Sequence, residues 1–177
     1  MRRISVLKKC IIAAICAICL FVAAFLVTWI PHTVDRTLSA VRYRTDGILN
    51  PLDMTIIMNG KLSTPWFFSP RFSGTIQIEG YPQTFDYDTF DITLMPQANK
   101  TYTGSLIYGG IENGEARLDM FGFISTTKTM DEICIMIPEP IGAETSSYDD
   151  EHGLVIVAPA TVGDLEDAQA IKERLYP

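Results

Sequence analysis

The chain has 177 residues, 21 acidic against 14 basic side chains, and a hydrophobic content of 47%. A net charge of −7 argues against nucleic acid as a partner, because binding to phosphate backbones relies on clustered Lys and Arg. With only two histidines and four cysteines, the chain has few side chains for zinc clusters or Ser–His–Asp triads.

The first 30 residues carry the strongest pattern. A basic flank, residues 1–9, precedes an uninterrupted apolar run from Cys10 to Ile30. At about 1.5 Å per residue, a helix of this length spans roughly 30 Å, which is the thickness of the hydrocarbon core. Cleaved signal peptides usually have shorter apolar regions. Residues 10–30 therefore predict a single transmembrane helix, a signal-anchor that ends at Trp29 and Ile30.

The charges on either side of this run predict its orientation. Four cationic side chains precede it, whereas the first cation after it is Arg36. Lys and Arg resist translocation, so we expect a cytoplasmic N-terminus and an extracytoplasmic remainder in the cell membrane. Trp29 suits the outer interface, where an indole ring lies among lipid headgroups. All 21 acidic residues follow residue 30, against 10 basic ones, giving the remainder a charge of about −11.

Residues 31–50 read as a stalk or linker between the anchor and a folded domain. Val34, Leu38 and Val41 recur at helical spacing among charged residues, and Asn50-Pro51 ends the pattern. We therefore expect a partly helical stalk, followed by an extracytoplasmic β-rich domain over residues 51–177.

The domain itself shows the twofold period of strands. Residues 75–79 and 90–94 alternate between apolar and polar side chains, as half-buried antiparallel strands do. Residues 103–108 and 116–125 form the clearest hairpin, because glycines between them supply the positive φ of tight turns. Turn residues recur at the spacing typical of a β-sandwich or barrel. The predicted fold is mainly β, an antiparallel sandwich or barrel.

Two later segments differ because both of their faces are apolar. Residues 132–137 and 154–157 should lie at the centre, between sheet and helix, with Cys134 as a small buried hydrophobic residue. The covering helix is predicted at about residues 162–175. Its apolar stripe consists of Leu165, Ala168, Ile171 and Leu175.

Aromatic side chains supply the candidate binding residues. Phe121 and Phe123 are expected on one strand face, and a pocket inside the strand layer would be lined by Tyr102, Tyr108, Phe121 and Phe123. A second cluster, Trp66-Phe67-Phe68, lies between two prolines and could line a pocket, touch the bilayer or cap the core. The simplest interpretation is that it caps the core.

Reactive groups give weaker signals. The acidic clusters at residues 86–91 and 149–151 could hold calcium, but neither has EF-hand spacing. His152 is the one imidazole beyond the membrane boundary, because His32 follows the span directly. No catalytic, cofactor-binding or metal-ligating residue is assigned, and no cofactor is expected.

These observations favour a non-enzymatic binding or structural module of a cell-envelope assembly. Its expected partners are the lipid bilayer, through residues 10–30, and an envelope protein. One alternative is a carrier of an apolar ligand or lipid with a pocket inside the strand layer. A second is a hydrolase that uses carboxylates or His152. The oligomeric state is left open.

Overall fold

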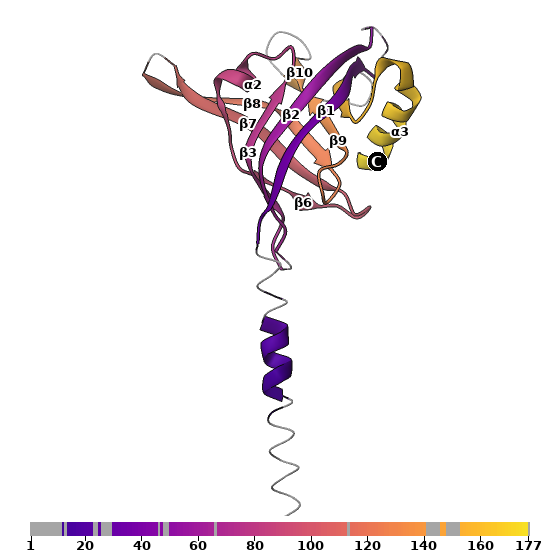
Figure 1. Cartoon of the computed structure of the whole chain (residues 1–177). Coiled ribbons are helices and arrows are strands. Elements are labelled where there is room, and N and C mark those ends of the chain that lie inside the picture. The colour runs from indigo at the N-terminus through magenta and orange to yellow at the C-terminus, as the bar shows by residue number, and fades with distance from the viewer. Residues whose placement is uncertain are drawn as a thin grey trace, which may run out of the picture.

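The computed structural model describes residues 12, 14–22, 25, 30–45, 47, 50–65, 67–112, 114–140, 146–147 and 153–176. One antiparallel sheet dominates it and curls into a half-barrel (Figure 1). The longer strands are β1 (His32–Arg44), β2 (Leu52–Ser63), β3 (Arg71–Ile78), β7 (Tyr102–Glu112), β8 (Glu115–Thr126), β9 (Ile133–Ile137) and β12 (Leu154–Ala158).

The remaining elements are two-residue strands and helical segments. They are α2 (Gln83–Asp86), β4 (Asp88–Thr89), β5 (Ile92–Thr93), β6 (Met95–Pro96), the small β10 (Glu139–Pro140) and β11 (Ser146–Ser147) pair, a 3-10 turn at Val162–Asp164, and α3 (Leu165–Leu175). The main strand order is β4-β7-β8-β9-β12-β1-β2-β3-β5, and β6 also pairs with β7. The predicted antiparallel sheet, C-terminal helix and hairpin of residues 103–125 are therefore confirmed.

The curl of the sheet brings its two ends together. Residues 88–96 alternate between the ends, because β4 and β6 pair with β7 whereas β5 pairs with β3. The Tyr108 hydroxyl donates a 2.6 Å hydrogen bond to the Ile76 carbonyl, which joins β7 to β3 directly. Burial raises the pKa of this phenol well above its usual value, so the hydroxyl keeps its proton.

Alternate residues of the strands fill the inside of the half-barrel. Every second residue of β2 from Met54 to Met58 points inward, as the twofold period of a strand requires. The inner core includes Ile56, Met58, Phe72, Ile76, Ile78, Ile92, Leu94, Leu106, Tyr108, Phe121, Ile124, Ile133, Ile135 and Ile156.

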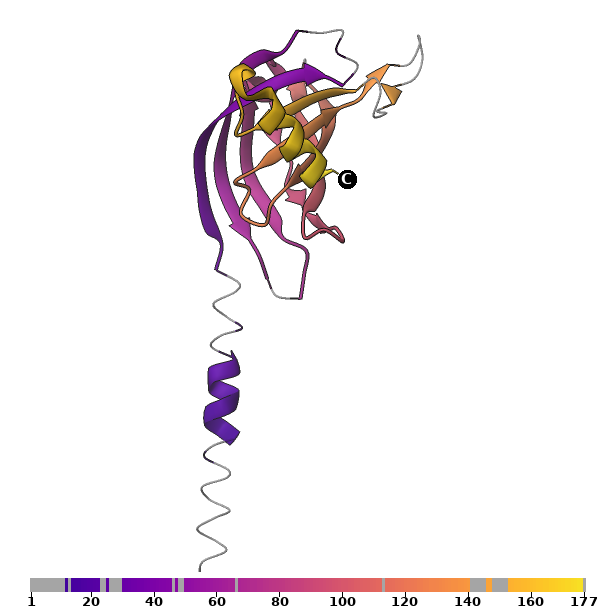
Figure 2. The same cartoon turned by 90° about the vertical axis from the view of Figure 1, so that its right-hand side faces the viewer.

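Helix α3 covers the outer face of β9 and β12 (Figure 2). Beneath it lies a second cluster of apolar side chains: Val41, Tyr43, Cys134, Met136, Val155, Val157, Ala160, Ala168 and Leu175. Both faces of β9 and β12 are thus buried, as predicted for residues 132–137 and 154–157, and Cys134 is fully buried.

The stalk predicted for residues 31–50 is wrong over most of its length. Residues 32–44 form β1, which pairs with β2 from His32 opposite Leu62 to Arg42 opposite Leu52. The spacing of four between Val34 and Leu38 places them on one side of a helix, but equally on one side of a strand. Val34 and Leu38 contact the inner core, while Val41 packs in the cluster under α3.

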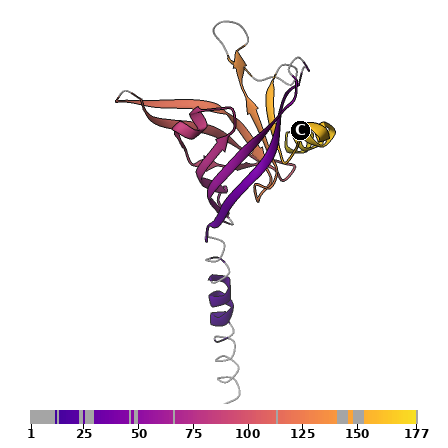
Figure 3. The same ribbon diagram turned by 45° about the horizontal axis from the view of Figure 1, so that its top comes forward.

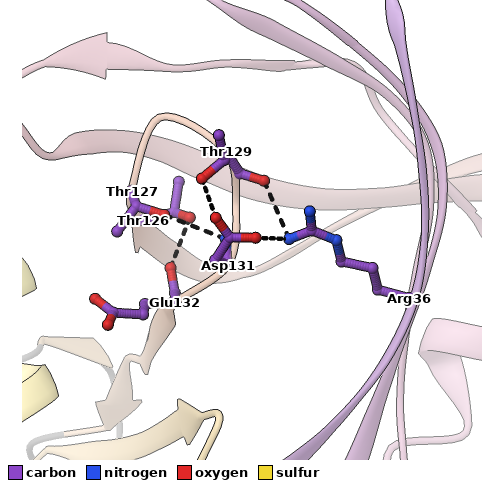
Figure 4. Close-up of polar contacts among 6 residues, drawn as sticks. All are labelled: Arg36, Thr126, Thr127, Thr129, Asp131 and Glu132. Atoms are coloured by element: carbon purple, nitrogen blue, oxygen red, sulfur yellow. Dashed lines mark hydrogen bonds and ion pairs between the residues drawn. The ribbon is translucent and has the colours of Figure 1, made fainter.

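A polar contact ties β1 to the turn between β8 and β9 (Figure 4). The Arg36 guanidinium forms an ion pair with Asp131 and donates a 3.3 Å hydrogen bond to the Thr129 carbonyl. Within the turn, Thr126 Oγ1 donates to the Glu132 carbonyl at 2.7 Å. The two contacts of Arg36 hold the turn against β1, which is more than ninety residues away in sequence.

The predicted membrane helix lies only partly within the described residues. Cys10 and Trp29 are not among them, and residues 14–22 are helical. Within the described part of the chain, none of the helices combines the length and apolar character needed to cross a bilayer.

Candidate functional site

The four aromatic residues predicted to line a pocket do not share one. Tyr108 and Phe121 lie in the inner core, where their rings meet edge to face with centroids 5.7 Å apart. Tyr102 is half-buried against that core, whereas Phe123 is 40% exposed on the outer side. The prediction that Phe121 and Phe123 share a face is therefore wrong.

A β-bulge in β8 explains this difference. Leu106 of β7 lies opposite Gly122, but the next residue, Ile107, lies opposite Met120. Phe121 is therefore an extra residue, and it reverses the alternation of side chains along the strand. As a result, Phe121 points inward, while Met120 and Phe123 both face outward.

Gly122 marks the point where β8 separates from β9. A Cβ atom at this position would lie 2.2 Å from the Met136 carbonyl oxygen, so no larger residue fits without movement of the backbone. Strand β9 pairs with β8 only from Phe123 to Thr126. The rest of the hairpin projects away from the sheet and from α3 (Figure 3).

On the N-terminal side of the bulge, one edge of β8 has no pairing strand in the described part of the chain. Among the described residues no strand pairs with Glu115–Phe121 on the side away from β7. An open edge presents backbone N–H and C=O groups that a further strand can satisfy. As far as the structure is described, the backbone of Glu115–Phe121 can thus serve as a template for a further strand.

The outer side of the same hairpin carries an unusual number of exposed apolar side chains. Register places Ile111, Leu118 and Met120 on one side, and the Phe90 ring covers Gly109 beside Leu118. We call this surface the apolar face; it consists of Phe90, Met95, Ile111, Leu118, Met120 and Phe123, each at least 40% exposed. Contiguous exposed apolar surface of this kind is typical of interaction sites.

Two grooves meet at Phe123. One, of about 400 Å³, is lined by Phe90, Met95, Thr103, Ile107 and Phe123. The other, of about 530 Å³, lies between β8 and the end of α3 and is lined by Gln97, Asn99, Phe123, Met136, Leu175 and Tyr176. Phe123 therefore separates two concave surfaces on the outside of the domain.

The charges near the hairpin are mostly acidic. Arg117 forms an ion pair with Glu112 and lies 6.0 Å from the centroid of the Tyr87 ring. The hydrogen bond from Arg117 keeps the pKa of Glu112 below its usual value. Further carboxylates on the hairpin and the neighbouring segment are Asp86, Asp88, Glu115 and Asp119.

The reactive groups considered in the sequence are not gathered into a site. Burial raises the pKa of the Cys134 thiol to about 12, so it is neutral at physiological pH. Asp91 pairs with Arg71, and the part of the chain that the structure describes has no cluster of three metal-ligating side chains. His152 and residues 149–151 lie outside the described residues.

The aromatic cluster at residues 66–68 does not cap the core as predicted. Phe67 and Phe68 are 69% and 62% exposed on the turn between β2 and β3, and Trp66 lies outside the described residues. The prediction failed because aromatic composition alone does not show whether a turn folds over the sheet or extends from its end.

Comparison with known protein families, with curated proteins and with solved structures gave no match for this chain.

Proposed function

We propose that this protein is a non-enzymatic binding module of a cell envelope, anchored by residues 10–30, which binds an extended segment of an envelope protein along β8. The observation that carries this proposal is that Glu115–Phe121 combine an open strand edge with the apolar face. The alternative predictions, an apolar-ligand carrier and a hydrolase, gain no comparable support from the described residues.

Strand addition explains how these two features would work together. An extended peptide on the open edge would form main-chain hydrogen bonds with β8, which supply affinity whatever the sequence of the peptide. Its alternate side chains would lie beside Leu118 and Met120, which supply specificity. The groove between Phe90 and Phe123 lies over β7, across β8 from the open edge, so it is a separate concave surface beside the strand-addition site.

Charge favours a different protein over a second copy of this chain. The part after residue 30 carries about −11, and most charges near the hairpin are carboxylates. Two identical acidic edges repel each other when they approach, whereas a basic segment is attracted. We therefore assign the edge to a partner segment that contains Lys or Arg among apolar residues.

The anchor supports the same function. We infer a cytoplasmic N-terminus and an extracytoplasmic β-domain in the cell membrane, a single-pass arrangement based on residues 1–30. Because both partners are confined to one membrane surface, a tether raises their effective concentration, and a modest interface is sufficient.

Site-specific photocrosslinking in the native membrane tests the proposal. A photoreactive residue at Leu118 or Met120 should give one crosslinked product with a protein of defined mass. The same residue at Asn59, an exposed position on β2, is the matched control and should give none. Met120→Lys should abolish the product formed from position 118. Equal crosslinking from positions 59 and 118 would contradict the proposal.

A further inference from the structure

The turn between β2 and β3 exposes two large aromatic side chains at one end of the sheet. Phe67 and Phe68 together form an apolar projection, and backbone hydrogen bonds fix its base. The Phe68 amide donates to the Pro65 carbonyl at 3.4 Å, and the Leu94 amide donates to the Pro70 carbonyl at 2.8 Å. These two hydrogen bonds therefore fix the backbone on both sides of Phe67 and Phe68.

This turn lies at the end of the domain from which the N-terminal segment leaves (Figure 2). Strand β1 begins at His32, directly after the apolar run that ends at Ile30. His32 pairs with Leu62 near the end of β2, and Ser63 pairs with Arg71 at the start of β3. No long spacer therefore separates the sheet from the apolar run.

A direct contact joins the turn to that run. The centroid of the Phe67 ring lies 6.1 Å from that of Phe25, with the ring planes inclined at 38°. Phe25 belongs to the apolar run, so at least one ring of the turn reaches the level of its outer part.

We propose that this turn is a second membrane contact, in which Phe67 and Phe68 insert into the outer leaflet beside the anchor. The inference rests on the proposed function, because it requires residues 10–30 to span the bilayer. The occupant of the aromatic surface is then lipid. Aromatic rings favour the interface between headgroups and acyl chains, where they gain apolar contact without crossing the membrane.

The charges around the turn fit a lipid surface. His32, Lys61 and Arg71 are exposed at the same end of the sheet and can face lipid phosphates. Asp91 pairs with Arg71, and Asp35 is also exposed on β1, so this cationic rim is partly neutralised. The rings of Phe67 and Phe68 therefore provide the main contact, and the cations add to it.

This second contact would fix the orientation of the domain. A sheet attached at one point rotates about its tether, whereas a sheet attached at two points keeps one edge toward the membrane. The β7–β8 hairpin would then be held in one orientation relative to the bilayer. A partner confined to the same membrane would meet the open edge of β8 in that single orientation.

Fluorescence quenching by brominated lipid tests the inference on the full chain. The protein is placed in phosphatidylcholine vesicles with brominated acyl chains, and both native tryptophans are replaced by Trp29→Phe and Trp66→Phe. Phe68→Trp then provides the reporter, with Phe67→Trp as a second reporter in case one variant folds poorly. Ile111→Trp, an exposed apolar position on the distant hairpin, is the matched control.

The expected result is several-fold stronger quenching at position 68 or 67 than at position 111. Equal, weak quenching at all three positions, in protein that resists alkaline extraction from the vesicles, would overturn the inference and leave the anchor intact. That result is also expected if a protein partner, not lipid, covers the turn. Release of the protein by alkaline extraction would overturn the anchor and this inference together.

Discussion

Two parts of the same sheet have opposite environments. One is the pair of strands β9 and β12, and the other is the projecting end of the β7–β8 hairpin, which includes the residues of β8 before Gly122. The first pair is covered by the inner core and by α3, and its residues are almost all buried. The hairpin has comparable apolar side chains, yet Ile111 and Leu118 are at least 70% exposed. Apolar strand residues are therefore core where a helix covers them, and they stay exposed where no described element does.

The bulge at Phe121 divides these two regions. Before it, β8 forms the outer wall of the apolar face, and after it, β8 joins β9 in the core of the sheet. One extra residue thus changes both the direction of the strand and the side to which each aromatic ring points.

The largest expected difference between the two regions is the loss of stability when an apolar side chain is truncated. Ile135→Ala in β9 removes a fully buried side chain and leaves a cavity, at a cost of about 2–5 kcal/mol in the free energy of unfolding. Leu118→Ala on the apolar face should change stability by less than about 0.5 kcal/mol. Urea denaturation of both variants measures the difference. Similar losses would mean that the apolar face is packed, not open.

Enlargement of Gly122 should have the next largest effect. In Gly122→Ala the new methyl group meets the Met136 carbonyl, so β8 and β9 must separate locally, at a cost of about 1–3 kcal/mol. Thermal unfolding provides the measurement. Gly163→Ala is the control, because the nearest atom lies 3.7 Å from the added Cβ. An unchanged melting temperature in Gly122→Ala would show that the two strands are not held closely at the bulge.

The sequence predicted the covered region better than the open one. Residues 132–137 and 154–157 are apolar on both faces, and helix α3 has a clear stripe, so local patterns suffice to place them together. The apolar face depends on the bulge at Phe121, which interrupts the twofold period of β8. Gly122 is a local signal of such a bulge, but a glycine alone does not tell which side of the strand stays exposed. The sequence shows that Leu118 and Met120 alternate with charged residues. It does not show which side of the strand stays uncovered.

The stalk shows a different source of error. Val34 and Leu38 fit both the helical and the strand period, and only pairing with β2 decides between them. That pairing joins residues on either side of a turn and depends on tertiary contacts. Local spacing therefore could not exclude a helix.

Loss of the hydrogen bond between Tyr108 of β7 and Ile76 of β3 should lower the stability of the domain moderately. Tyr108→Phe removes the hydroxyl that donates to the Ile76 carbonyl, at a cost of about 1 kcal/mol, because a buried acceptor loses one donor. The ring still packs against Phe121, so the core volume barely changes. Amide hydrogen exchange should accelerate in β3 more than in β9. Uniform acceleration throughout the sheet would contradict a local role in holding the half-barrel together.

The contact between Arg36 and Asp131 should have the smallest effect, and it depends on pH. The Thr129 hydroxyl and then Arg36 lower the pKa of Asp131, so its stabilising contribution is present above the ordinary value of 3.8 and is lost as the pH falls through the lower folded value. Both side chains are substantially exposed, so solvent screening limits the contribution to about 0.5 kcal/mol. Denaturation midpoints of Asp131→Asn and the native chain should therefore differ at pH 6 and converge near pH 2. Thr129→Val should produce part of the same loss, whereas a constant difference across this range would assign the effect of Asp131→Asn to packing.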